Sequence, residues 1–249
     1  MKKTAIALFA LAAIGTVAAP AMADGVYQSL PFSQNWSNIA LVSADDDWSA
    51  VPGIIAYRGD DATTTTPPAD AGLYTVDNSA PLDVNANRPD PLTFFTGGAT
   101  EFELANPVVA LTGSGTADGP HLVLHLNTTG KVNITVQYLI RDLEGVGSTD
   151  NAQQQVALQY RIGGVGVWTN VPAGYVADAT TGPDTAIDTP VSVVLPVGAE
   201  NQATLQVRIL TTNAIGNDEW VGIDDINVRG EDPVPAAISS WGKVKGLYR

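Results

Sequence analysis

The strongest candidates for binding a ligand or a metal ion are the adjacent carboxylates of Asp224 and Asp225, near the C-terminal end. The apolar residues before this pair alternate in one phase, and those after it alternate in the other. They are Val221 and Ile223, followed by Ile226 and Val228. A change of phase within one strand predicts a β-bulge, which would turn both carboxylates toward one region of the surface. Oxygen-rich clusters of this kind suit a hard cation such as Ca²⁺.

A second acidic pattern could support hydrolysis of a glycan. Glu101 and Glu103 are two residues apart, so on a strand they would share a face, with backbones about 6.5 to 7 Å apart. Glycosidases use two carboxylates that flank a sugar bond, and Glu219 offers a third candidate. The acidic alternation stops at Leu104, so the match to the strands of jelly-roll glucanases is partial. A carboxylate-based hydrolase is therefore the alternative function and not the preferred one.

Composition excludes several other kinds of chemistry. The chain has no cysteine, and therefore no disulfide, no thiol nucleophile and no cysteine zinc site. Its two histidines, His121 and His125, would share a strand face about 13 Å apart, too far to chelate one metal. A total of 12 Lys and Arg against 26 Asp and Glu gives a net charge of −14. Such a surface repels phosphate backbones, which argues against nucleic-acid binding.

Apolar and polar residues that alternate with a period of two predict the β-strands of the fold. The clearest runs are 122–126, 132–140, 156–162, 191–197 and 205–209. Gly, Pro, Asn and Asp clusters separate them, and no comparable helical period occurs after residue 23. Residues 59–91 predict long surface loops with one strand-like stretch, Leu73 to Val76. The pattern predicts an all-β fold, an antiparallel two-sheet jelly-roll sandwich.

The N-terminus has the features of a cleavable secretory leader. Two lysines precede a short apolar run, and Ala21-Met22-Ala23 supplies the small residues that signal peptidase requires. The leader resembles those of Gram-negative outer-membrane and periplasmic proteins. We expect residues 1–23 to be removed and the mature chain to be secreted, with no membrane span. Ten cations against 26 anions would then leave a net charge of −16.

The mature chain is predicted to be one domain, residues 24–230, followed by a Pro linker and tail, residues 231–249. Beyond residue 235 the tail contains cations and aromatic residues but no acid. We predict that it is a sorting tail, or that it docks on the acidic domain. Its candidate residues are Trp241, Lys243, Lys245, Tyr248 and Arg249.

Two stretches resemble the ends of a known architecture. Trp220 to Ile226 is similar to the closing strand of secreted bacterial jelly-roll modules of the cleaved-adhesin, MAM-like and carbohydrate-binding families. Phe32 to Trp36 resembles their opening strand, and the resemblance implies that the two strands lie side by side. It also implies a structural calcium held by Asp224 or Asp225 together with N-terminal oxygens. The N-terminal candidates are Asp45, Asp46, Asp47 and the region of Asn35.

An exposed tryptophan could be a contact for a carbohydrate ligand. Trp48 follows three aspartates, so we predict that it lies near the surface as a carbohydrate contact. The predicted function is a secreted, non-catalytic binding or adhesion module of the bacterial cell surface or extracellular space. Its predicted partner is a glycan or a cell-surface protein. The alternatives are the hydrolase and a structural subunit of an extracellular matrix or appendage.

Overall fold

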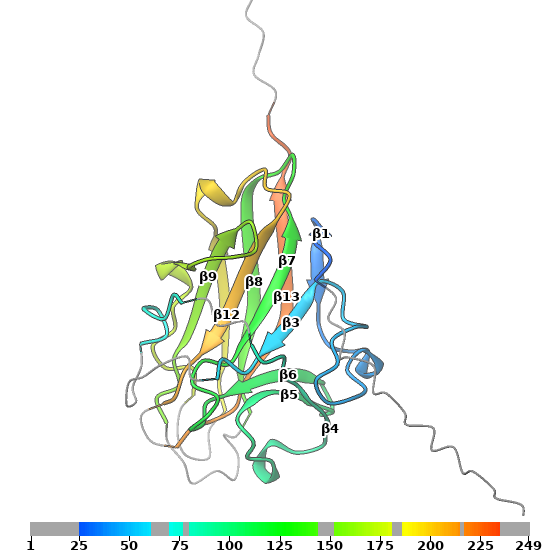
Figure 1. Ribbon diagram of the computed structural model, residues 1–249, viewed down its shortest axis with the longest axis vertical. Coiled ribbons are helices and arrows are strands. Elements are labelled where there is room, and N and C mark those ends of the chain that lie inside the picture. Colours follow the sequence, from blue (N-terminus) through cyan, green and yellow to red (C-terminus); the bar gives the residue numbers. More distant parts are fainter. Residues whose placement is uncertain are drawn as a thin grey trace, which may run out of the picture.

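The computed structural model describes residues 25–60, 70–76, 80–143, 152–180, 186–214 and 217–234. These residues form two sheets packed face to face (Figure 1), which confirms the predicted all-β sandwich. The predicted leader and the residues of the predicted sorting tail lie outside this part of the chain. Within the described residues, no helix has the length and apolar character that crossing a membrane requires.

One sheet has seven strands, with β13 near its middle. The order is β11, β8, β13, β6, β5 and β4, and β2 pairs with β13 as well. The bounds are β11 Asp188–Val194, β8 Val132–Asp142, β13 Val221–Glu231, β6 Val108–Thr112, β5 Gly98–Phe102, β4 Asn85–Arg88 and β2 Phe32–Gln34.

The other sheet has six strands in the order β1, β7, β12, β9 and β10, with β3 paired to β7. The bounds are β1 Gln28–Ser29, β7 His121–Asn127, β12 Leu205–Thr211, β9 Val156–Ile162, β10 Thr169–Asn170 and β3 Ile54–Tyr57. Short 3₁₀ turns are η1 Ile39–Leu41, η2 Pro91–Thr93, η3 Pro172–Gly174 and η4 Val197–Ala199. The pairs are antiparallel except β1 with β7 and β4 with β5.

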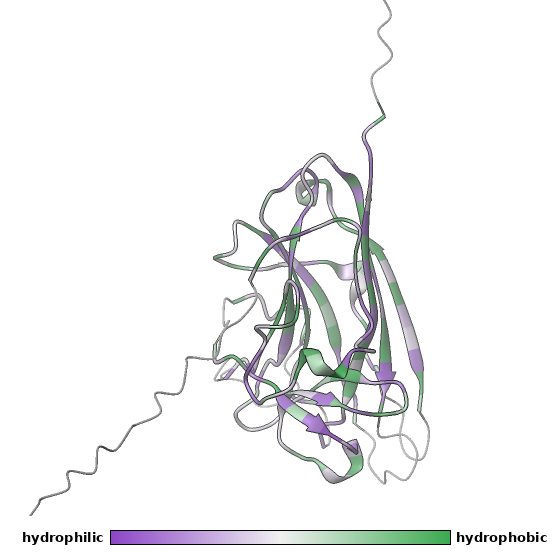
Figure 2. Cartoon of the chain, turned by 90° about the vertical axis from the view of Figure 1, so that its right-hand side faces the viewer, coloured by the Kyte–Doolittle hydropathy of each residue, from purple (hydrophilic) through white to green (hydrophobic). Residues whose placement is uncertain are grey.

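The core lies between the sheets and collects the inward residues of the alternating runs. Leu122, Leu124 and Leu126 of β7 lie in it, together with Ile134, Val136 and Ile140 of β8. Figure 2 shows the alternation of hydrophobic and hydrophilic residues along the strands. The predicted run 191–197 ends early, at Val194, because Pro196 cannot continue the ladder and η4 follows it.

Strand β13 contains the predicted bulge. Its register against β8 shifts between Asp224 and Asn227. Before the shift its other neighbour is β6, and after it the neighbour is β2. The predictions of a bulge at the two aspartates and of paired N- and C-terminal strands are both confirmed.

The polar side of the six-stranded sheet is buried, whereas the alternation predicted that it faces solvent. Gln159, Arg161 and Arg208 are at most 6% exposed. The segment 70–76, a turn and not the predicted strand, is bonded to this face. Arg208 Nη2 donates to the Tyr74 carbonyl (2.8 Å), and Trp168 N donates to the Thr75 carbonyl (2.8 Å). The polar groups are therefore satisfied by loop carbonyls instead of water.

Strand β11 forms an outer edge of the seven-stranded sheet, and among the described residues no strand pairs with its far side. Leu195 N donates to Ile134 O and Asp142 N donates to Ile187 O, so the backbone N–H and C=O groups of the odd-numbered residues of β11 point toward β8. The backbone groups of the even-numbered residues, including Pro190, therefore point toward the free edge. Because proline has no N–H, this edge lacks a donor in the middle of the strand.

Candidate functional site

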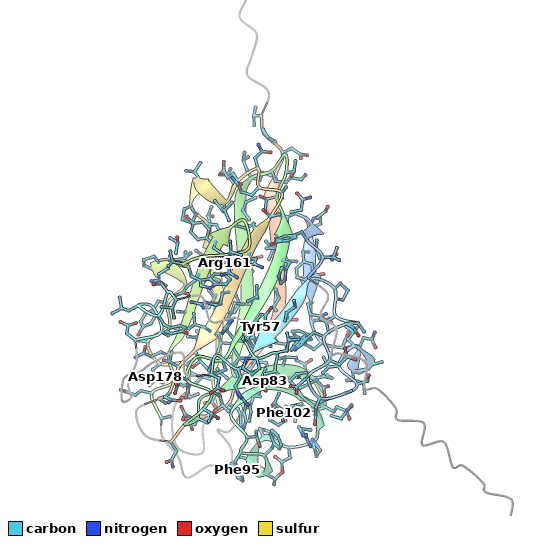
Figure 3. The ribbon with its side chains drawn as sticks, viewed as in Figure 1. Tyr57, Asp83, Phe95, Phe102, Arg161 and Asp178 are labelled. Carbon is cyan, nitrogen blue, oxygen red and sulfur yellow. The ribbon has the colours of Figure 1, made fainter. Side chains whose placement is uncertain are left out.

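A hollow of about 230 Å³ opens beyond β6, where the chain also enters β13. It is lined by Phe95, Thr112, Gly113, Ser114, Asp218 and Trp220. Phe95 is 80% exposed, an unusual state for a phenylalanine in a folded domain. Figure 3 shows Phe95 at the tip of the molecule, beyond the buried Phe102.

The loop that carries Phe95 is anchored on its inner side. Asp90 accepts from Leu92 N (2.9 Å) and starts η2. The Phe94 ring stacks on Trp220 with centroids 6.1 Å apart and meets Phe102 edge-on. The Trp220 Nε1–H group donates to the Phe94 carbonyl (3.0 Å). Because neighbouring side chains of an extended chain point to opposite sides, fixing Phe94 inward directs Phe95 outward.

The hollow also has polar lining residues. Asp218 Oδ1 accepts from Ala214 N (2.7 Å), which holds the carboxylate close to Gly113. A Cβ at Gly113 would lie 2.5 Å from Asp218 Oδ1, so only glycine permits this approach. Ser114 Oγ accepts from Ala117 N (2.9 Å). The hollow therefore combines one aromatic face with a carboxylate and two hydroxyl groups, Thr112 and Ser114.

At the bulge, the two predicted carboxylates have different environments. Asp224 is buried and accepts from Arg141 Nη1 (3.1 Å) and Asn106 Nδ2 (3.0 Å). Burial raises the pKa of Asp224, and the Arg141 charge opposes this shift. Asp225 has a φ of +48° and is exposed, and it lines a polar pocket of about 270 Å³ beside β2.

Each aspartate of the 45–47 run accepts a hydrogen bond from a backbone N–H group. Asp45 accepts from Ala86 N (2.8 Å), Asp46 from Val84 N (3.2 Å) and Asp47 from Ser49 N (2.9 Å). Two of the three thus fasten their loop to β4 and the residue before it.

The predicted calcium ligands do not gather around one point. Among the described residues, no group of three or more His, Asp or Glu side chains is placed to hold a metal ion. Asp224 is already matched by a guanidinium, which disfavours a cation beside it. Calcium binding stays a prediction, and Asp225 is the predicted ligand that is exposed in a pocket.

The prediction that Trp48 lies near the surface is wrong. Trp48 is fully buried, its Nε1–H group donates to the Asp83 carbonyl (3.1 Å), and its ring meets Trp36 edge-on. Asp45 and Asp46 bond backbone N–H groups beside this part of the core. The charged residues before Trp48 therefore do not indicate that Trp48 is exposed. Trp36, Trp168 and Trp220 are buried too.

The carboxylates of the hydrolase alternative are not grouped in a cleft. Glu101 is 2% exposed and its Oε2 accepts from Asn87 N (2.8 Å), whereas Glu103 is exposed beyond the end of β5. Burial raises the pKa of Glu101 to about 7. Glu219 is buried and accepts from Ala152 N (3.1 Å). His121 and His125 are buried beside Tyr57 and Tyr27.

Neither Phe95 nor the bulge pocket was predicted from the sequence. The pair Phe94-Phe95 after an Asp-Pro turn was a usable signal, because two adjacent rings on an extended chain cannot both face one core. The pocket depends on which atoms of Gln34 and Asn35 the backbone engages, and composition gives no sign of that.

Comparison with known proteins finds likeness in fold only. No protein-family model matches the chain, and no curated protein matches it. A carbohydrate-binding module specific for non-crystalline cellulose is 14% identical, with a TM-score of 0.39 over 55% of this chain and 84% of that one. The K3 cleaved-adhesin domain of Lys-gingipain from Porphyromonas gingivalis is 13% identical, with a TM-score of 0.33 over 51% and 75%. A cyclase from Fischerella sp. TAU is 14% identical, with a TM-score of 0.37 over 74% and 86%. Likenesses this distant carry no argument about function.

Proposed function

We propose that this protein is a secreted, non-catalytic glycan-binding module and that the hollow beside Phe95 holds its ligand. The observation that carries the proposal is a ring 80% exposed on an anchored loop, beside hydroxyl and carboxylate groups. A pyranose has an apolar C–H face that covers an aromatic ring, and hydroxyls that need donors and acceptors. Secretion rests on the leader in the sequence.

Two features favour binding over the alternatives. Glu101 and Glu219 are buried within the fold, and carboxylates that cleave a sugar bond must reach it from an open cleft. An appendage subunit that polymerises by strand addition needs an unblocked edge, and Pro190 interrupts one of the outer edges, that of β11.

The proposal predicts the result of removing the exposed ring. Phe95→Ala should weaken binding about tenfold or more to the ligands that the wild-type protein retains on a glycan array, because an aromatic anchor is lost. The melting temperature should stay unchanged, because the ring packs on little of the fold. Val197→Ala, at a valine 78% exposed outside the hollow, is the matched control and should bind as wild type. Equal binding by Phe95→Ala would move the site elsewhere, and an array with no wild-type ligand would contradict the function.

The tail keeps its sequence-based role as a proposed sorting signal. Deleting residues 239–249 should change the compartment in which the protein accumulates while the domain keeps its melting temperature. Fractionation of cells and medium measures this. Unchanged distribution of the shortened protein would rule out sorting by the tail.

A further inference from the structure

The pocket at the bulge is separate from the hollow beside Phe95 and has a different chemical character. It is lined by Ser33, Gln34, Asn35, Asp225, Ile226 and Asn227, with no aromatic residue. It lies where β2 pairs with β13, immediately after the register shift. Four of its lining residues pair across the β2–β13 ladder, Gln34 with Ile226 and Ser33 with Asn227.

Backbone hydrogen bonds determine which atoms the two carboxamides present to this pocket. Gln34 Oε1 accepts from Trp36 N (2.8 Å), and Asn35 Oδ1 accepts from Ser37 N (3.2 Å) and from the Ser37 hydroxyl (2.9 Å). A backbone N–H can only donate, so the bonded side-chain atom in each case must be the oxygen. The side-chain atoms of Gln34 and Asn35 that remain available to a ligand are therefore the two NH₂ groups, which are donors.

The acceptor side of the pocket is the Asp225 carboxylate. The left-handed backbone at Asp225 turns this side chain outward, whereas its neighbour Asp224 is bonded to Arg141. Among the described residues, no protein group bonds the Asp225 carboxylate, Asn35 Nδ2 or Gln34 Nε2. The pocket thus offers oriented donors and a charged acceptor to one ligand.

We propose that the bulge pocket binds a vicinal diol of a sugar. It would be a second carbohydrate site, in addition to the hollow beside Phe95. A hydroxyl group both donates and accepts, so a diol can donate to Asp225 while it accepts from Asn35 or Gln34. A bare cation would meet the NH₂ groups of both carboxamides and have only one carboxylate to bind it. The pattern therefore selects a diol over calcium.

The test is an amide NMR titration of the ¹⁵N-labelled protein with the methyl pyranosides of mannose, galactose and glucose. At least one should cause saturable shifts at residues 33–37 and 225–227. Asn35→Asp keeps the oxygen that Ser37 needs but replaces the pocket-facing NH₂ by a carboxylate oxygen. This variant should bind the sugar about tenfold or more weakly, and it should gain shifts on addition of CaCl₂. Asn38→Asp, the same change at an exposed residue outside the pocket, is the matched control and should behave as wild type.

The outcomes separate this proposal from its rivals and from the proposed function. A response to glycerol as strong as that to the glycosides would also support a diol site, and would make a free polyol its ligand. Wild-type shifts with CaCl₂ alone, sugar binding by Asn35→Asp equal to wild type, or no shift with any probe would each overturn it. Shifts at residues 94–97 report the hollow beside Phe95 independently, so either site can fail without the other.

Discussion

Replacing Arg208 by methionine should lower the free energy of unfolding by about 3 kcal/mol or more. Arg208 is fully buried on the outer face of the six-stranded sheet. Its guanidinium donates to the carbonyls of Tyr74 (2.8 Å) and Val76 (3.2 Å) and to Gln159 Oε1. It also lies 4.5 Å from the centre of the Trp168 ring. Methionine fills similar volume, but it would leave these buried acceptors without donors.

Denaturant unfolding followed by tryptophan fluorescence measures this loss. Arg229→Met is the control, because Arg229 is exposed on β13 and, among the described residues, its side chain bonds only Gln137 Oε1. It should change stability by about 0.5 kcal/mol or less. The segment 70–76 should also become a site of proteolysis in Arg208→Met, since the guanidinium holds its carbonyls on the sheet. Equal stability of the two variants would contradict the assigned role of Arg208.

The second large effect is a fall in the free energy of unfolding as pH rises, caused mainly by the ionisation of Glu101. Burial raises its pKa from 4.5 to about 7, so the folded protein holds this proton more tightly than the unfolded chain does. The stabilisation is fully present below about pH 4.5 and is lost as pH rises to about 7. Burial raises the pKa of Asp83 to about 6, which adds in the same direction. We expect the protein to melt at a higher temperature near pH 5 than near pH 8.

Glu101→Gln isolates the contribution of this one group. Glutamine keeps the oxygen that accepts from Asn87 N but cannot ionise. The variant should be more stable than wild type by up to about 3 kcal/mol near pH 8, and the difference should vanish toward pH 4.5. Glu103→Gln changes the exposed neighbour and should follow the wild-type pH profile. Identical profiles for Glu101→Gln and wild type would show that Glu101 ionises in the folded protein without cost.

Much of the fold follows from local pattern. Strict alternation locates β7, β8, β9 and β12, because only one face of each strand packs in the core between the sheets. The phase change at Asp224 locates the bulge, since an inserted residue reverses the side to which the following residues point. The burial of Arg208 could not be predicted this way. Alternation marks a polar face, and it does not reveal that loop carbonyls replace water there.

The candidate sites were harder to predict, for reasons visible in single residues. Asp45 and Asp46 satisfy N–H groups of a neighbouring segment that is distant in the sequence, so their charge says little about ligands. Trp48 beside them is buried in the core, and its indole N–H donates to the Asp83 carbonyl. Phe95 is exposed because the neighbouring Phe94 ring stacks on Trp220, which directs the Phe95 ring to the opposite side of the chain. Each outcome depends on a tertiary contact that no local pattern encodes.

The position of β13 has a kinetic consequence. The last strand of the described residues lies in the middle of its sheet, between β8 on one side and β6 and β2 on the other. The bond from the Trp36 indole to the Ile223 carbonyl closes a loop across 187 positions. Contacts this distant form late and make folding slow. Until β13 has been synthesised, β2, β6 and β8 therefore each have an edge without its partner strand. The seven-stranded sheet can form only afterwards.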